Sequence, residues 1–316
     1  MTLDKNSFMN NYFQKKPHLT RRQFIKSTAA GAAALYMMPS TMVFGSTTKI
    51  NHQKSRVVSI RHQGLINPDE RINAKNAREC IDEVLQQLTG QANLKDAWMH
   101  IFPEFNLKDT IGLKVNCVNR KCPTHPEIAY AICDSMIEAL AINPNQIIIW
   151  DRSTSELKKC GYTINKSDNG IQCFGTVKSF SVARWMFNQK MDETGAIGYD
   201  KTRVIDVGDG VTSQLSNILT QKCTYLINVP VLKDHGRAGI TLSLKNHFGS
   251  IDNPTDCHDN LCEPFISRIN ADPQIKEKTR LIICDAAYGV YDGGPLGAPQ
   301  WQHKSILAAT DPVALD

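Results

Sequence analysis

The chain lacks the short glycine-containing motifs that mark several large enzyme classes. Neither a G-x-x-x-x-G-K-[ST] loop nor a G-x-S-x-G elbow occurs in its 316 residues, which disfavours a nucleotide-dependent kinase and a serine hydrolase. Gly208 and Gly210 form a G-x-G, but no third glycine follows at the spacing that a dinucleotide-binding loop requires. We therefore interpret this pair as part of a turn.

The ten cysteines are dispersed rather than clustered. They extend from Cys80 to Cys284 without the closely spaced run that holds a ferredoxin-type iron–sulfur cluster, so we expect no cluster of that type. Cys133, Cys223 and Cys284 stand in apolar helix or strand patterns. These three are expected to be buried thiols that act as small hydrophobic side chains.

An excess of positive charge is also missing from most of the chain. The 36 lysines and arginines and the 31 acidic residues give a net charge of +5, but six of the basic residues and one acid lie in residues 1–45. The rest of the chain has 30 residues of each sign and a net charge of zero. Nucleic acid is therefore not an expected partner.

Near the N-terminus, the apolar stretch at residues 29–38 is interrupted by Gly31 and ends at Pro39. A run of this length is too short to span a bilayer, so we expect no stable membrane anchor.

The N-terminus does contain the most specific motif of the chain. Residues 20–26, TRRQFIK, match the twin-arginine export signal, with Arg21 and Arg22 as the paired arginines. Val43 and Gly45 are small enough for the recognition positions of a signal peptidase, so residues 1–45 are expected to be a signal peptide. An ordinary basic, amphipathic N-terminal helix is the alternative.

Such a signal makes the twin-arginine translocase a partner during export and the periplasm the expected location. The route carries proteins that are already folded, often because a cofactor was loaded in the cytoplasm, although some passengers carry none.

The remainder of the chain has the pattern of one α/β domain. A polar linker is expected at residues 46–56 and the domain at residues 57–316. Apolar positions at helical spacing predict helices at 73–88 and 127–140. Apolar runs predict strands, mostly of the buried parallel kind, at residues 57–60, 110–115, 146–150, 202–207, 225–229, 280–284 and 306–309. The alternation indicates a mostly parallel sheet flanked by helices.

The end of the sequence predicts a helix that is barely begun. Asp311 has the character of a helix cap and Pro312 that of the first helical residue, but only four residues follow. A helix of that length cannot cover a sheet face, so we expect the natural domain to continue beyond residue 316.

Polar residues gather where the predicted strands end, and an open parallel sheet binds ligands beyond the carboxyl ends of its strands. The candidates for catalysis are Lys233, His235, Lys245, Asn246 and Asp285. His235 would be a general base or a metal ligand, and Lys233 and Lys245 would neutralise an anionic group. The alternative for both lysines is a position on the solvated surface.

Four further residues at or after the ends of predicted strands are candidates for binding a cofactor. Lys114 and Asn116 belong to the end of the strand at 110–115, and Gly293 and Gly294 lie in a glycine-rich loop at 289–297.

Histidine and cysteine are concentrated between residues 235 and 262. Imidazole and thiolate are common ligands of zinc, copper and iron. A transition metal here would be held by residues drawn from His235, His247, Cys257, His258 and Cys262. The spacing matches no compact metal-binding motif, and each histidine has the alternative of a capping or core position.

Cys257 and Cys262 are separated by four residues in a polar segment that we expect to be a loop. We predict that they form a disulfide or jointly bind a metal, because a turn of this length can bring the two sulfurs together. Two unpaired, partly exposed thiols are the alternative, and folding in the reducing cytoplasm before export favours it.

Two stretches of sequence carry a family resemblance. Residues 228–235, NVPVLKDH, and 239–249, GITLSLKNHFG, resemble the signature of domain-of-unknown-function family 362. Shorter pieces agree, namely GLKVN at 112–116, DGGP at 292–295 and TDPVALD at 310–316.

The resemblance covers residues 55–316 and implies little about activity, since the family's biochemistry is largely undefined. Some members carry an appended ferredoxin-like domain with iron–sulfur clusters, which this chain's cysteine pattern does not support. Members usually continue past the last motif, in agreement with a truncated C-terminus.

Together these patterns predict an exported periplasmic enzyme with a metal or redox cofactor, such as an oxidoreductase, that acts on a small anionic substrate. The alternative is a non-catalytic periplasmic protein that binds an anion or a metal.

Overall fold

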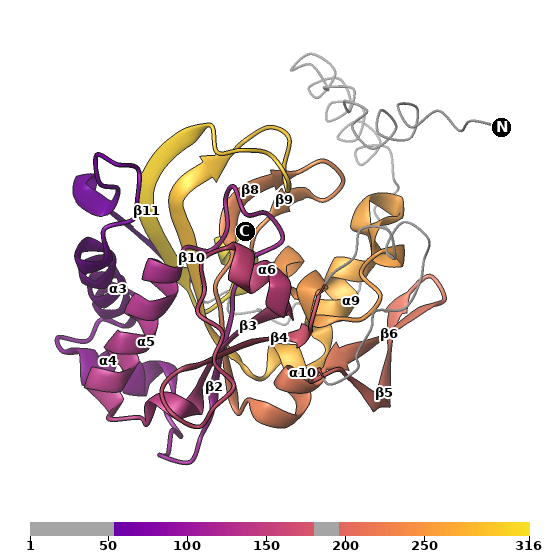
Figure 1. The fold of residues 1–316 in the computed structure, drawn as a ribbon, viewed down its shortest axis with the longest axis horizontal. Coiled ribbons are helices and arrows are strands. Elements are labelled where there is room, and N and C mark those ends of the chain that lie inside the picture. The colour runs from indigo at the N-terminus through magenta and orange to yellow at the C-terminus, as the bar shows by residue number, and fades with distance from the viewer. Residues whose placement is uncertain (1–53, 180–195) are drawn as a thin grey trace, which may run out of the picture. The chain divides into compact units, whose positions relative to one another are not determined.

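The computed structural model describes residues 54–179 and 196–316, and Ser55–Asp316 forms one compact unit. Its centre is a nine-stranded sheet in the order β1-β11-β10-β7-β2-β3-β4, with a β8–β9 hairpin attached to β10 (Figure 1). The strands are β1 (Val57–Arg61), β2 (Ile111–Lys114), β3 (Ile147–Ser153), β4 (Gln172–Val177), β7 (Tyr225–Asn228), β8 (Val231–His235), β9 (Gly239–Thr241), β10 (Thr279–Val290) and β11 (Trp301–Ala309). The export motif at 20–26, the candidate cleavage site and most of the 46–56 linker lie outside the described residues.

Five neighbouring strands, β10, β7, β2, β3 and β4, are parallel, whereas β11 runs antiparallel to β10 and β1 antiparallel to β11. The prediction of an α/β fold with a mostly parallel sheet flanked by helices is confirmed. All four residues of β2 and all four of β7 are buried. Parallel strands covered on both faces read as continuous apolar runs, which is why the sequence identified them.

Three helices cover one face of the sheet: α3 (Ala74–Thr89), α4 (Leu94–Ile101) and α5 (Pro126–Leu140) (Figure 1). Asn73 and Asn93 cap the first two, each side chain accepting a backbone N–H three residues on. The apolar faces of the helices pack on alternate strand residues, among them Leu113, Ile149 and Ile227. Alternation along a strand sends the intervening residues to the opposite face.

On the opposite face, Ile148, Trp150 and Leu226 of the main sheet join a second apolar cluster with Val207 and Phe265. This layer contains β5 (Tyr199–Gly208), β6 (Val211–Ser216), η3 (Ile218–Lys222), α9 (Phe265–Ala271) and α10 (Pro273–Lys276). These elements lie apart from α3, α4 and α5 (Figure 1).

The prediction that residues 202–207 form a parallel strand of the main sheet is wrong. They belong to β5, which pairs antiparallel with β6 in a separate two-stranded sheet. The two strands are joined by Asp209 and Gly210, both with positive φ, which confirms that the Gly208–Gly210 segment makes a turn. Val204 is 59% exposed. The apolar residues of this run therefore did not indicate a strand buried between two layers of helices.

The remaining elements are short. They are η1 (Gln63–Leu65), η2 (Pro144–Gln146), α6 (Thr154–Lys159), α8 (Ser243–Asn246), η4 (His247–Ser250), η5 (Asp256–His258), η6 (Asn260–Cys262) and α11 (Pro312–Leu315). The Asp311 side chain accepts the N–H groups of Val313 and Ala314, so the predicted cap of the last helix is confirmed. In the described part of the chain, no helix combines the length and the apolar character needed to cross a membrane.

The order of the strands reverses at β2. From β2 the chain passes through α5 to β3 and then to β4 on one side, whereas β7 and β10 lie on the other side of β2. Such a reversal leaves a crevice beyond the carboxyl ends of the strands, where α/β proteins bind ligands. The residues that follow β2 and β3 therefore occupy the position expected for a site.

Gly175 in β4 offers a test of how tightly the end of β3 is packed. A Cβ at this position would overlap the backbone of Ser153 and Thr154 at the start of α6, and backbone cannot rotate away as a side chain can. We expect Gly175→Ala to lower the free energy of unfolding by about 3 kcal/mol, at the upper end of overpacking effects. Urea unfolding measures the loss.

The matched control is Gly236→Ala, because a Cβ there has no atom within 4 Å. Its unfolding midpoint should stay near that of the parent protein. A Gly175→Ala variant as stable as the control would contradict the packing argument.

Candidate functional site

A cavity of about 100 Å³ lies beyond the carboxyl ends of β2 and β3, at the reversal of strand order. Its walls combine the ends of these strands with the β8–β9 hairpin and the segment from α8 to η5. The residues that line it are Lys114, Asn116, Val118, Asp151, Arg152, Glu156, His235, Thr241, Lys245, Asn246, Phe248, Gly249, Pro254, His258 and Pro295.

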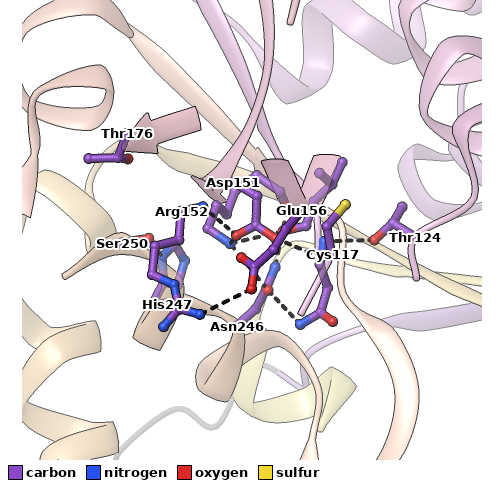
Figure 2. Close-up of polar contacts among 12 residues, drawn as sticks. Cys117, Thr124, Asp151, Arg152, Glu156, Thr176, Asn246, His247 and Ser250 are labelled. Atoms are coloured by element: carbon purple, nitrogen blue, oxygen red, sulfur yellow. Dashed lines mark hydrogen bonds and ion pairs between the residues drawn. The ribbon is translucent and has the colours of Figure 1, made fainter. Parts of the chain in front are cut away.

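One wall contains a buried ion pair between the ends of two adjacent strands. Lys114 Nζ lies 2.7 Å from Asp151 Oδ1, and the two side chains are 1% and 6% exposed. The ammonium also donates to the Val115 carbonyl at 2.9 Å. Asp151 Oδ2 accepts the Cys117 N–H at 2.6 Å, and Oδ1 accepts the Arg152 N–H at 2.7 Å (Figure 2). A buried charge persists only with partners of this kind, so the pair ties β2 to β3.

Asparagine amides extend the ion pair into a network. Asn246 Oδ1 accepts from Asn116 Nδ2 at 3.0 Å and from Lys114 Nζ at 3.4 Å. Asn246 Nδ2 donates to the Lys114 carbonyl at 3.1 Å and to Asn228 Oδ1 at 2.7 Å. Asn228 in turn donates to the Ser243 carbonyl at 2.8 Å. The network therefore fixes α8 against the ends of β2 and β7.

Lys233 lies next to this network but does not line the cavity. Its Nζ donates to Asn116 Oδ1 at 2.7 Å and to the Cys122 carbonyl at 3.1 Å, and only 1% of the residue is exposed. Burial lowers the pKa of Lys233 below its usual range. The alternative of a solvated surface lysine is wrong for Lys233 and for Lys245, since both are buried.

Arg152 and Glu156 form a second, less buried pair on the cavity wall. Arg152 Nη2 lies 3.4 Å from Glu156 Oε1, and both side chains are largely buried (Figure 2). Burial raises the pKa of Glu156, against the opposing effect of Arg152. Glu156 lies in the first turn of α6, where Ser153 Oγ accepts its N–H at 3.4 Å. This carboxyl therefore retains a proton to higher pH than an exposed glutamate does.

Lys245 presents a different environment from the other two buried lysines. Its Nζ lies 3.0 Å from His258 Nε2 and 3.3 Å from the centroid of the Phe248 ring. Burial lowers the pKa of Lys245 to about 7, against the opposing effects of Cys262 and Cys257, and the charge of Arg152 makes a smaller contribution in the same direction as burial. The amine therefore exists in both its charged and neutral forms near neutral pH.

The tautomers of the two cavity histidines follow from their backbone partners. His258 Nδ1 lies 2.6 Å from the Pro254 carbonyl, which can only accept, so Nδ1 carries the proton and Nε2 accepts from Lys245. Burial lowers the pKa of His258 to about 3, with the charge of Lys245 as the next cause. His235 Nδ1 accepts the N–H groups of Arg237 and Ala238 at 3.1 and 3.0 Å, so the neutral His235 ring carries its proton on Nε2.

The last residue of the sequence positions α8. Asp316 Oδ1 accepts the Ser243 N–H at 2.8 Å and Oδ2 accepts the Leu244 N–H at 2.9 Å, and Ser243 Oγ also donates to this carboxylate. These N–H groups belong to the first turn of α8, where no partner exists within a helix. Asp316 thereby fixes the helix that presents Lys245 and Asn246.

Six of the candidates from the sequence meet in the cavity: Lys114, Asn116, His235, Lys245, Asn246 and His258. Gly293 and Gly294 do not line it, but the Gly294 N–H donates to Asp234 Oδ1 at 2.7 Å, and the following Pro295 is a lining residue. Asp285 does not line it either. It is fully buried and pairs with His125 at 2.7 Å between Oδ2 and Nδ1.

The five candidates for metal ligation do not form one donor set. His247 points into the interior, with Ser250 Oγ at 3.1 Å and Asn228 Nδ2 at 3.4 Å, and His235 and His258 stack with ring centroids 5.6 Å apart. Across residues 54–179 and 196–316, no three His, Cys, Asp or Glu side chains are grouped so as to hold a metal ion.

Cys257 and Cys262 are buried thiols, so the predicted disulfide between them is not formed in this structure. They lie in η5 and η6 and join the apolar cluster around Phe265. The expected loop consists of two short 3-10 helices, and the alternative of partly exposed thiols is wrong because both cysteines are buried. Burial raises the pKa of Cys257 to about 12, which keeps this thiol protonated at neutral pH.

Several cavity residues were not among the candidates. Asp151 and Arg152 follow a predicted strand, which is a weak positional signal. Glu156 had a clearer one, since Ser153 and Glu156 have the spacing of a capping box at the start of a helix. Thr241, Phe248 and Gly249 lie within the family-like motif at 239–249 but carry no pattern that separates them from core residues.

The Lys114–Asp151 pair gives a direct test of the network. Asp151→Asn leaves the Lys114 ammonium buried without a carboxylate, and breaking a buried pair from one side typically costs about 3–5 kcal/mol. We expect a loss of this size in urea unfolding. The control is Glu79→Gln, which removes the exposed Lys75–Glu79 pair at 3.8 Å and should cost less than about 1 kcal/mol. Equal losses in the two variants would show that the buried pair is not a stabilising constraint.

Comparison with known proteins gives a family but no activity. No curated protein matches the chain. A crystal structure of a protein from Thermotoga maritima is loosely similar, with a TM-score of 0.35 and 10% sequence identity over 80% of this chain. The chain covers 57% of that protein's length. Residues 111–316, well over half of the sequence, match the family described as Domain of unknown function (DUF362), and the chain belongs to that family.

Proposed function

We propose that this protein is an exported enzyme that acts on a small anionic molecule in the cavity at the ends of β2 and β3. The observation that carries the proposal is Lys245, a buried amine on the cavity wall whose pKa is lowered to about 7 by burial. Perturbed groups of this kind concentrate at functional sites, because acid–base and nucleophilic chemistry require them.

The charge of the cavity favours an anion. Its lining contains three cationic side chains, those of Lys114, Arg152 and Lys245, and two carboxylates, those of Asp151 and Glu156. With both histidines neutral the formal charge is +1, and it increases when Glu156 takes up a proton. The raised pKa of Glu156 favours that protonation.

Within this charge distribution, Lys114 and Lys245 have different roles. Lys114 is neutralised by Asp151 and held by three acceptors, so it maintains the cavity wall. Lys245 donates its hydrogen bond to a neutral imidazole at 3.0 Å. Its positive charge is therefore not cancelled by a bonded carboxylate and is available to an anion that enters the cavity.

Lys245 can also exchange a proton at neutral pH. A group whose pKa lies near the working pH serves well as a general acid or base. The described residues contain no group of His, Cys, Asp and Glu side chains that could hold a metal ion. The proposed chemistry therefore depends on Lys245, Glu156 and Arg152 and not on a metal.

A first test is anion binding as a function of pH. Oxalate and acetate are suitable probes because neither titrates between about pH 6 and pH 8.5. We expect affinity by calorimetry to fall about tenfold or more over this range, because Lys245 loses its charge as the pH passes its pKa of about 7.

The variant Lys245→Met should bind oxalate about 10–100-fold more weakly at low pH, the effect of losing a charge-assisted hydrogen bond, and should lose most of the pH dependence. Any pH dependence of oxalate affinity that remains in this variant would be assigned to the titration of Glu156. The control Lys75→Met alters an exposed lysine on α3 and should bind as the parent does. If the affinity for oxalate changes neither with pH nor in Lys245→Met, the site is refuted. Tight binding with no turnover of any anion tested would favour a binding protein.

Export is tested separately with the double substitution Arg21→Lys and Arg22→Lys. If residues 20–26 form a twin-arginine signal, the changed protein should remain in the cytoplasm at its uncleaved mass, because the translocase requires the arginine pair. Cell fractionation and intact-mass analysis measure this. Undiminished delivery of the double variant to the periplasm would contradict the export proposal and leave the cavity proposal untouched.

A further inference from the structure

We propose that Lys245 is a covalent nucleophile that forms an imine with the carbonyl carbon of a small 2-oxo acid bound in the cavity. The inference rests on the proposed anion site and adds to it a reaction class and a substrate class. It follows from comparing the three buried lysines of the sheet edge and from what surrounds each amine.

Two of the three lysines are fully engaged by acceptors. Lys114 Nζ has a carboxylate, a backbone carbonyl and an amide oxygen within 3.4 Å. Lys233 Nζ has an amide oxygen at 2.7 Å and a backbone carbonyl at 3.1 Å. All three donors of Lys114 therefore have oxygen partners. Burial lowers the pKa of Lys233 as well, but Lys233 does not line the cavity, so neither amine is placed to attack a molecule bound there.

Lys245 has different partners among the described residues. Its partners are the Nε2 of a neutral imidazole at 3.0 Å and the face of Phe248 at 3.3 Å. The cationic Arg152 is close enough to affect its titration. Desolvation next to an apolar surface and a second cation is the arrangement that activates lysine amines for attack on carbonyl groups.

The same neighbours indicate the substrate. Arg152 carries a guanidinium suited to a carboxylate, and it lines the same cavity as the Lys245 amine. A molecule that engages both carries a carbonyl carbon as well as a carboxylate, as a 2-oxo acid does. The cavity of about 100 Å³ accommodates a molecule with a short carbon skeleton, such as glyoxylate or pyruvate.

The reaction balances with the groups in the cavity. The neutral Lys245 amine attacks the carbonyl carbon, a C–N bond forms, the C=O π bond opens, and one proton moves from the attacking nitrogen to the carbonyl oxygen to give a carbinolamine. The nitrogen lone pair then expels the hydroxyl group as water, with a proton from the Glu156 carboxyl, and the remaining N–H proton returns to the Glu156 carboxylate to complete the imine. One water leaves for each imine formed, and nothing is oxidised or reduced.

The experiment traps the imine by reduction. The protein is incubated with pyruvate and sodium cyanoborohydride, and the adduct is read by intact mass and located by peptide mapping. We expect one adduct per chain, at Lys245. Its yield should rise as the pH increases through about 7, where this amine becomes neutral, whereas an exposed lysine would require a pH near 10.4.

Two variants and two competing small molecules separate the parts of the inference. Lys245→Arg keeps a positive charge but has no nucleophilic amine, so it should bind oxalate and form no adduct there, with circular dichroism confirming that it is folded. Arg152→Gln should reduce trapping of pyruvate but not of acetone, which has no carboxylate. Excess oxalate should protect Lys245 in the parent protein.

Labelling spread over surface lysines without preference for Lys245 would overturn the inference, and so would equal trapping of acetone and pyruvate in the parent. If oxalate binds with the expected pH dependence but no adduct forms at Lys245, the anion site stands and the imine is refuted. If oxalate does not bind, both proposals fail together.

Discussion

A lysine ammonium buried among strand ends must be given a carboxylate and nearly complete hydrogen bonding, and the carboxyl edge of this sheet is organised around that requirement at Lys114. The cost of leaving such a charge unpaired is several kcal/mol. Lys114 itself ends β2, and its acceptors come from the next residue, from β3 and from α8, so these three elements cannot separate without leaving the charge unsatisfied. Asp151 meets the rest of the requirement, because its two oxygens also accept the backbone N–H groups of Cys117 and Arg152. The rigidity of the cavity wall is thus a consequence of one buried charge.

The helix α8 connects the buried Lys114 charge to the part of the cavity that contains Lys245. This helix has only four residues, far fewer than a helix needs to be stable alone, and it is held from three directions. Asn246 bonds to β2 and β7, Asp316 accepts the first N–H groups, and Asn270 donates to the Leu244 carbonyl at 2.8 Å. Lys245 is therefore placed by tertiary contacts on both sides of it in the chain, and not by the helix itself.

The sequence predicted the sheet better than the site, because an apolar run indicates that a segment is buried but not which strands or side chains it contacts. The runs at 225–229 and 280–284 became parallel strands of the main sheet, whereas the similar run at 202–207 entered a separate hairpin with Val204 exposed. For the site, the family-like motif led to Lys245 and Asn246. Density of histidine and cysteine along the chain, however, does not imply convergence in space, since His247 bonds to Ser250 and Cys257 packs against an apolar cluster. Glu156 faces the cavity only because β3 and α6 place it there, which no spacing within residues 229–262 could reveal.

The three buried lysines at the carboxyl edge of the sheet show how the same side chain acquires different properties from the groups that contact its amine. Lys114 has a carboxylate partner and ties two strand ends together in the cavity wall. Lys233 has oxygen acceptors from Asn116 and Cys122 and joins β8 to the segment after β2. Lys245 is buried to a similar extent, 7% exposed against 1% for the other two, yet it meets a neutral ring nitrogen and an aromatic face. Burial is common to all three, so burial alone does not create a reactive amine. Lys245 differs in that it lines the cavity and that its amine contacts a ring nitrogen and an aromatic face, which is why the proposed chemistry is assigned to α8.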